Sequence, residues 1–147
     1  MTDPAAPPPG RSPRAVAHVL VLLTLFSLWT WKLLEPHPVS EEIRQGLADA
    51  GLGFAAAKSL HAAGYALLTV LVGTLPAPRH WRYFLVGLLA LHGVATEVGQ
   101  SFVPNRHGRY QDVLIDWAGI AAGVLVVKLF PARSLGTRPV TPPRSPT

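Results

Sequence analysis

Four long apolar segments, separated by short connections rich in proline and charge, constrain the fold of this chain more than any other sequence feature. The first covers residues 15–34 and contains only His18 and Lys32 as strongly polar residues. About 20 helical residues cross the roughly 30 Å hydrocarbon core of a bilayer, so this segment predicts a transmembrane helix. Because Trp29 and Trp31 follow its apolar core without a small-residue cleavage site, we interpret it as an uncleaved span, not a signal peptide.

The other three apolar segments have similar lengths and end at proline-containing turns. Between the first two, Ser40 followed by Glu41 and Glu42 is typical of a helix start and predicts a short helix through Ala50. That helix is too short to cross the bilayer, so we expect it at the membrane interface. The predicted spans are 15–34, 54–75, 83–103 and 112–130.

Composition supports a membrane protein. The chain has 147 residues, of which 49% are hydrophobic and only 14% charged, which is too apolar for an ordinary soluble domain. It has no cysteine, which excludes disulfides, thiolate metal sites and a cysteine nucleophile. The net charge of +5 lies mainly at the ends and in short loops, without an aromatic-interleaved basic patch, so we expect no nucleic-acid partner.

These features predict an all-α fold. We expect a four-transmembrane-helix bundle with one short interfacial helix between the first two spans. The membrane domain is expected over 15–131, with a Pro-rich, disordered basic leader at 1–14 and a disordered tail at 132–147. Nothing in the sequence predicts an oligomeric state.

The distribution of Lys and Arg predicts the orientation. With the amino terminus in the cytoplasm, eight of the 13 basic residues lie in cytoplasmic segments and five in outer ones. We therefore expect both termini to be cytoplasmic. Arg106 and Arg109 are exceptions, because this orientation places their turn outside.

This orientation brings polar side chains of three spans to the exterior end of the bundle. Since an ionised group is costly in lipid, we expect Lys58 and Arg106 to pair with Glu97 and Asp112. The inner halves of these spans are almost free of charge, which disfavours a transport path through a monomer, although an oligomer leaves that alternative open. The predicted ligand-binding residues are Lys58, His61, Glu97, Gln100, Arg106, Asp112 and Asp116.

Several of these residues have a purely structural alternative. Asp112 is placed to cap the fourth span, and His61 and Tyr65 are placed to form interhelical hydrogen bonds. His92 is expected to pack between helices. Glycines at 119 and 123 form a small-xxx-small pattern that predicts close helix packing.

Two stretches of the chain also carry a family pattern. The first is Lys58-Ser-Leu-His61-Ala-Ala-Gly-Tyr65, and the second is Glu97-x-x-Gln100-Ser-Phe-Val-Pro104-Asn-Arg106 followed by Asp112, Asp116, Gly119 and Gly123. Over about residues 54–127 they resemble the VanZ-like membrane protein family. Two positions depart from its pattern: Asp116 stands where an asparagine is usual, and Ala57 where an acid often precedes the lysine.

The resemblance implies a multi-pass protein of the bacterial cytoplasmic membrane. It links some members to low-level resistance to glycopeptide antibiotics of the teicoplanin type, and it supplies no reaction. The first hypothesis is therefore a binding or accessory role in the cell envelope, with a lipid-linked cell-wall intermediate or a glycopeptide as ligand. Arg106 and Lys58 would bind an anionic group, while Glu97, Gln100 and Asp112 orient them.

The alternative hypothesis is an enzyme acting on the same lipid-linked precursor. Glu97 or His61 would act as the general base with Asp112 as its partner, because a desolvated carboxylate can serve in proton transfer. We favour the non-enzymatic role, since no nucleophile elbow, phosphate-cradling loop or zinc HExxH motif is present. No close ligand motif joins His61, His92, Glu97 and Asp112, so we expect neither a metal nor another cofactor.

Overall fold

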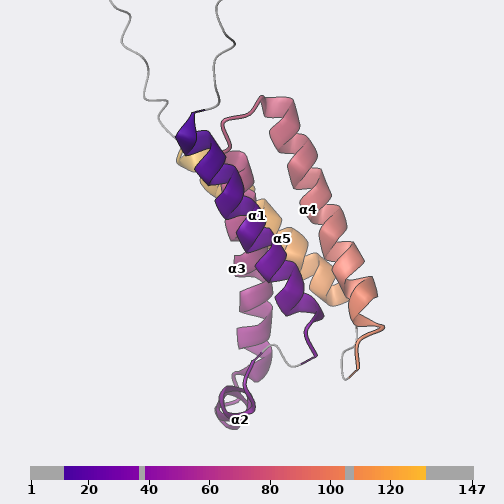
Figure 1. Cartoon of the computed structure of the whole chain (residues 1–147). Coiled ribbons are helices and arrows are strands. Elements are labelled where there is room, and N and C mark those ends of the chain that lie inside the picture. The colour runs from indigo at the N-terminus through magenta and orange to yellow at the C-terminus, as the bar shows by residue number, and fades with distance from the viewer. Residues whose placement is uncertain (1–11, 37–38, 105–107, 132–147) are drawn as a thin grey trace, which may run out of the picture.

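The computed structural model describes residues 12–36, 39–104 and 108–131. Within these ranges the chain forms five α-helices and no strand, so the all-α prediction is confirmed. The leader up to residue 11 and the tail from 132 lie outside the described residues, so the predicted disorder there stays a prediction. The helices are α1 Pro13–Leu34, α2 Glu41–Asp49, α3 Gly53–Gly73, α4 Arg79–Gln100 and α5 Tyr110–Leu129 (Figure 1).

The four long helices alternate in direction, and α2 lies beyond the end at which α3 begins (Figure 1). The most extensive contact joins α3 and α5, while α1 and α4 each pack against α3 and against one another. The start of α1 and the end of α5 lie at the same end of the bundle. The opposite end therefore contains the start of α3, the end of α4 and the start of α5.

Two glycines allow α3 and α5 to approach closely. A Cβ atom on Gly119 would overlap the backbone carbonyl of Ala62, and one on Gly123 would lie 2.6 Å from the carbonyl oxygen of Ala66 and 2.7 Å from Cβ of Thr69. Real Cβ atoms do not approach other atoms so closely. The predicted small-xxx-small packing on the last helix is confirmed, and its partner is α3.

The apolar core is small and lies where α1, α3, α4 and α5 face one another. The fully buried Tyr65 and Leu68 of α3 occupy its centre, and Trp29 of α1 packs directly on Gly64. All four long helices also expose large apolar side chains on their outer faces, including Leu20, Leu67, Leu91 and Leu125. Such a surface is unusual for a water-soluble bundle.

Two of the described helices, α1 and α3, have the length and apolar composition of membrane spans. Helices α4 and α5 are of comparable length, with 22 and 20 residues, but do not qualify by the same measure. Helix α4 carries the polar residues Glu97 and Gln100, and α5 carries Asp112 and Asp116. The bundle of four long helices is thus as predicted, while the membrane-spanning role of its last two helices needs a separate argument.

The helix predicted over 83–103 is displaced toward the amino terminus. Helix α4 starts at Arg79, directly after Pro78, and ends at Gln100. Residues 79–82, which precede the predicted helix, therefore form its first turn, where the guanidinium of Arg82 donates a 2.7 Å hydrogen bond to the carbonyl of Gly73. This bond satisfies a carbonyl that the end of α3 would otherwise leave unpaired.

The short helix α2 begins and ends nearly as predicted. Ser40 is its N-cap residue, although its side chain makes no capping hydrogen bond, and Glu41 forms an ion pair with Arg44. Gly51 follows the helix with φ of 68°, and the amide of Leu52 donates to the carbonyl of Leu47 at 2.8 Å. Together with a 2.9 Å bond from Gly51 to Ala48, this is a Schellman ending, which glycine stabilises because it tolerates positive φ.

Candidate polar site

Five ionisable side chains gather at the end of the bundle where α3 and α5 begin and α4 ends. Lys58 and His61 lie three residues apart on α3, and Asp112 and Asp116 lie four apart on α5, so each pair shares one helix face. Glu97 joins them from the last turn of α4. We call this set, Lys58, His61, Glu97, Asp112 and Asp116, the polar cluster.

Lys58 and Asp112 form an ion pair across the interface of α3 and α5. Their side chains are only 19% and 9% exposed, so the pair is largely removed from solvent. The predicted pairing of Lys58 with an acid is confirmed for Asp112. Asp112 lies in the first turn of α5, whose N-cap residue is Arg109. The predicted partner Arg106 lies outside the described residues.

His61 and Asp116 form a second interhelical pair. Nδ1 of His61 lies 3.0 Å from Oδ1 of Asp116, whose side chain is almost fully buried. The prediction that His61 makes an interhelical hydrogen bond is confirmed. Its aspartate partner was not predicted, because the four-residue spacing of Asp112 and Asp116 places both on one face without indicating which contacts which residue of α3.

Glu97 is held by the backbone of the segment that leads into α5. Its Oε2 accepts a 2.8 Å hydrogen bond from the backbone N–H of Arg109, and its side chain forms no ion pair with Lys58. The chain returning to α5 passes so close to α4 that a Cβ on Gly108 would overlap the carbonyl of Glu97. Of the two acids expected to pair with Lys58 and Arg106, Lys58 contacts Asp112 and not Glu97. The other expected base, Arg106, lies outside the described residues, so its pairing with Glu97 stays a prediction.

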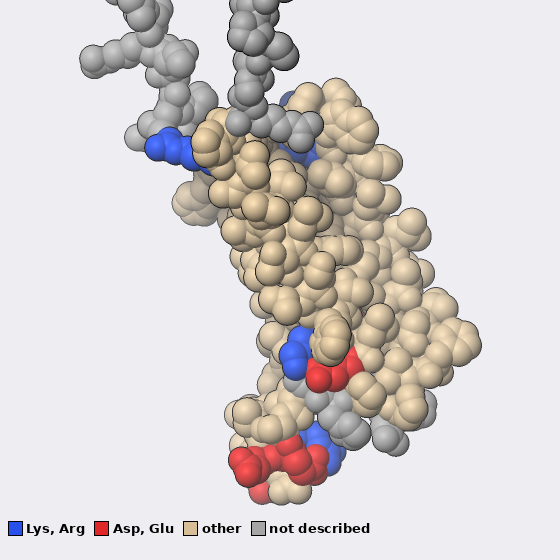
Figure 2. Space-filling view, in the orientation of Figure 1, with Lys and Arg blue, Asp and Glu red and all other residues tan. Residues whose placement is uncertain are grey.

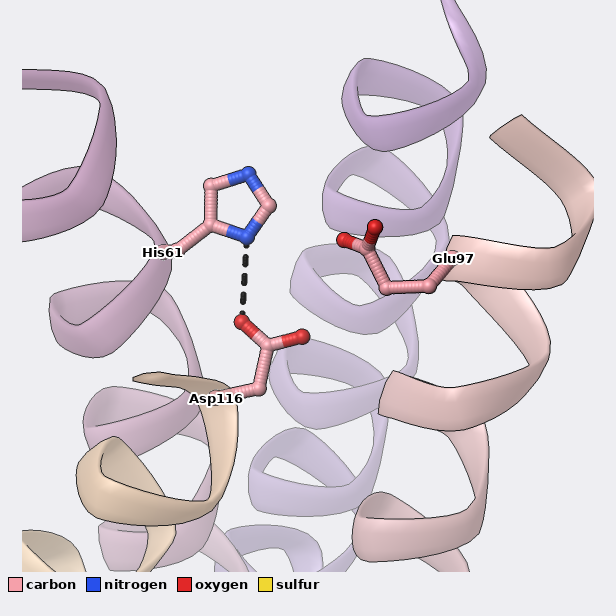
Figure 3. A group of neighbouring side chains, drawn as sticks. All are labelled: His61, Glu97 and Asp116. Atoms are coloured by element: carbon pink, nitrogen blue, oxygen red, sulfur yellow. Dashed lines mark hydrogen bonds and ion pairs between the residues drawn. The ribbon is translucent and has the colours of Figure 1, made fainter. Parts of the chain in front are cut away.

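His61, Glu97 and Asp116 point toward one another from three different helices (Figure 3). Glu97 and Asp116 are 5% and 0% exposed. Oε1 of Glu97 and Oδ2 of Asp116 are both buried and have no hydrogen-bond partner among the residues that the structure describes. A buried carboxylate oxygen without a partner is costly and rare in folded proteins, so this arrangement calls for a ligand or a proton.

A neutral hydrogen-bond network lies on the core side of the polar cluster. The hydroxyl of Tyr65 lies 3.0 Å from Nδ1 of His92 and 3.4 Å from the hydroxyl of Thr96. Nε2 of His92 lies 3.0 Å from the hydroxyl of Thr30 on α1. The prediction that His92 packs between helices is confirmed, and Tyr65 makes the interhelical bond expected of it.

Gln100 does not belong to the polar cluster. Its side-chain amide donates a 3.0 Å hydrogen bond to the carbonyl of Leu33 and so ties the ends of α4 and α1 together. Both groups are buried, which makes this bond a structural contact. Glu97 and Gln100 therefore share one face of α4 but contact different neighbours: Glu97 contacts the backbone before α5, and Gln100 contacts the end of α1.

We expect Tyr65→Phe to lower the free energy of unfolding by about 1 kcal/mol. The substitution removes one hydroxyl and leaves Nδ1 of His92 without its partner on α3, whereas the packing of the ring is kept. Thermal unfolding of the purified protein in detergent measures the change. Tyr83→Phe is a matched control, because Tyr83 is exposed at the start of α4; an equal loss in both variants would contradict the role given to the Tyr65 hydroxyl.

The fold and the polar cluster define a class: an all-α helical bundle with a buried site of acids, a lysine and a histidine at one end. The chain belongs to the VanZ/LLP1 family, whose family model matches residues 12–131. This match and the two candidate spans indicate a membrane protein. No curated protein and no solved structure matches the chain.

Proposed function

We propose that this protein is a four-span membrane protein whose polar cluster binds the polar headgroup of an envelope ligand. The observation that carries the proposal is the convergence of buried ionisable groups from α3, α4 and α5 at one end of an apolar bundle. Intramembrane ionisable residues are rare and generally functional. The matched segment, 12–131, agrees closely with the proposed membrane domain at 15–131.

The membrane-spanning role of α4 and α5 is supported by their outer faces. Phe84 and Leu91 on α4 and Leu114 and Leu125 on α5 are all exposed, as are the corresponding apolar residues of α1 and α3. Figure 2 shows the charged side chains gathered toward the two ends, with an uncharged surface between them. Glu97 and Gln100 of α4 and Asp112 and Asp116 of α5 are buried, so lipid does not reach them.

The orientation proposed is cytoplasmic for both termini, with the polar cluster near the exterior face of the bacterial cytoplasmic membrane. The start of α1 and the end of α5 share one end of the bundle, as this topology requires. The excess of Lys and Arg toward that end supports the assignment. A cluster at the opposite end is then within reach of lipid-linked headgroups on the outer leaflet.

The ligand class proposed is a lipid-linked cell-wall intermediate or a glycopeptide, in an accessory role related to antibiotic resistance. Carboxylates such as Glu97 accept hydrogen bonds from hydroxyl and amine groups, while Lys58 is the cation of the cluster for a phosphate or carboxylate. This binding role does not require the protein to catalyse a reaction. A resistance phenotype would follow if the bound intermediate is the antibiotic's target.

The proposal is tested by identifying lipids that copurify with the protein from native membranes. Mass spectrometry of the parent is expected to detect one headgroup class that is reduced at least fivefold in Arg106→Ala and in Asp116→Asn. Gln111→Ala, an exposed residue of α5, serves as the matched control and is expected to retain it. Equal lipid content in all four proteins would overturn the proposal.

A second candidate is acid–base catalysis, favoured by the 3.0 Å contact between His61 and Asp116 beside Glu97. In this variant Asp116 takes the orienting role first given to Asp112, which Lys58 already engages. Incubation of the purified protein with lipid-linked precursors distinguishes the two functions. Product formation that is lost in Glu97→Gln supports the enzyme, and binding without product supports the accessory role.

A further inference from the structure

The inward-facing part of the polar cluster has the donor geometry of a metal site. His61, Glu97 and Asp116 each offer one ligand atom, and these atoms lie within 4.8 Å of one another. The three residues come from α3, α4 and α5, so three separate helices fix their positions (Figure 3). An ion bound tetrahedrally at about 2.1 Å draws such atoms to about 3.4 Å apart, which small side-chain rotations can achieve.

The two carboxylates have unused lone pairs. Oε1 of Glu97 and Oδ2 of Asp116 are buried without a hydrogen-bond donor among the described residues. Oε2 of Glu97 is held by the amide of Arg109, whereas Oδ1 of Asp116 lies 3.0 Å from Nδ1 of His61. Coordination of an ion by Nδ1 would replace that contact, and the unpartnered oxygens of both carboxylates are left for the ion.

The charges of the polar cluster favour a bound cation. Lys58 and Asp112 neutralise one another, which leaves Glu97 and Asp116 as two acids beside a single histidine among the described residues. Protonation of His61 would compensate only Asp116, since Oε2 of Glu97 accepts its hydrogen bond from the uncharged backbone amide of Arg109. A divalent cation would compensate both acids and use both free oxygens at once.

We propose that His61, Glu97 and Asp116 bind one divalent transition-metal ion, Zn²⁺ or Mn²⁺. One imidazole nitrogen with two carboxylates suits these borderline ions, since imidazole favours zinc and iron while carboxylates also suit manganese. Three protein ligands leave at least one coordination position for water or another ligand. The proposal replaces the expectation of no metal, and it does not depend on the lipid ligand proposed above.

The three proposed ligands differ from the set considered in the sequence, which was His61, His92, Glu97 and Asp112. His92 is engaged by Tyr65 and Thr30, and Asp112 is engaged by Lys58. The three ligands are instead separated by 36 and 19 residues along the chain, which no local motif spacing reveals. Asp116 supplies the second negative charge.

The test is metal analysis of the full chain purified in detergent without metal-affinity steps. After equilibration with micromolar ZnCl₂ or MnCl₂ and removal of free ions, elemental analysis is expected to find about one ion per chain for one of the two metals. His61→Gln, Glu97→Gln and Asp116→Asn are each expected to weaken binding at least tenfold in titration. His80→Ala and Glu42→Gln, exposed residues outside the cluster, are the matched controls and are expected to bind as the parent does.

A direct spectroscopic measurement on the parent keeps the test independent of how the variants fold. With bound Mn²⁺, pulsed electron paramagnetic resonance is expected to detect coupling to one imidazole nitrogen, and with Zn²⁺, X-ray absorption is expected to fit one nitrogen from imidazole among oxygen ligands. Absence of stoichiometric binding by the parent overturns the proposal. Equal loss of binding in the His80→Ala control also overturns it, as does a bound ion without an imidazole ligand.

Failure of this test is distinguishable from failure of the proposed function. Metal content is measured on protein stripped of lipid, whereas lipid content is measured on protein taken from native membranes. A protein that binds the ion and no headgroup supports the metal site alone. A protein that retains the headgroup after chelation, without metal, supports the binding function alone.

Discussion

Lys58→Ala is expected to lower the free energy of unfolding by about 3 kcal/mol. The substitution removes the partner of Asp112, whose side chain is 9% exposed and whose charge would then be buried next to two other acids. Breaking a buried ion pair from one side is generally more costly than the pair itself is stabilising. Thermal and denaturant unfolding of the purified protein in detergent measure the loss.

The matched variant for this prediction removes both charges. Lys58→Met combined with Asp112→Leu keeps the side-chain volume and eliminates the uncompensated charge, so it is expected to recover most of the lost stability. Arg44→Ala is a control for an exposed ion pair, with Glu41, and is expected to change stability by less than about 0.5 kcal/mol. If the double variant is as unstable as Lys58→Ala, the loss does not come from a stranded charge.

The double variant Gly119→Ala, Gly123→Ala is expected to separate α5 from α3 and to reduce the yield of folded protein strongly. Each added methyl group meets backbone or Cβ atoms of α3 at distances that real structures do not contain, and neither neighbour is the end of a flexible side chain. Overpacking of a helix interface typically costs about 1–3 kcal/mol per site, so both sites together remove much of the stability of a small domain. Size-exclusion chromatography and thermal unfolding measure the effect.

Gly87→Ala is the matched control for this prediction. Gly87 lies on α4, and nothing lies within 4 Å of a Cβ placed there. Alanine is the better helix former, so this variant is expected to be neutral or slightly stabilised. A destabilisation equal to that of the Gly119 and Gly123 variant would show that helix contacts are not its cause.

Sequence reasoning located the helices well, because apolar segments of fixed length between prolines and glycines leave few alternatives. Four long helices and one short one were predicted, with most bounds within two residues of those observed. The largest difference is at α4, where the chain already becomes helical at Arg79. Arg82, which precedes the predicted span 83–103, lies in the first turn of α4 and stabilises the end of the preceding helix through the carbonyl of Gly73.

The candidate site was predicted only in part. Residue type and helical spacing identify which polar side chains share a face, and they placed Lys58, His61, Glu97, Asp112 and Asp116 at one end. Pairing across helices depends on the rotation and tilt of each helix in the bundle, which the glycine contacts of α5 fix and no single-helix pattern contains. For this reason Lys58 was expected to pair with Glu97 or Asp112 without a choice between them, and the convergence of His61, Glu97 and Asp116 was not predicted.

The order of the polar cluster along the chain has a consequence for biogenesis. Lys58, His61 and Glu97 enter the nascent chain before Asp112 and Asp116, which lie on the final helix. Until α5 is synthesised, a lysine and a histidine face the bilayer without the acids that compensate them. Insertion of the last helix therefore brings Asp112 to Lys58 and Asp116 to His61, and a product truncated before α5 leaves both basic side chains without these partners.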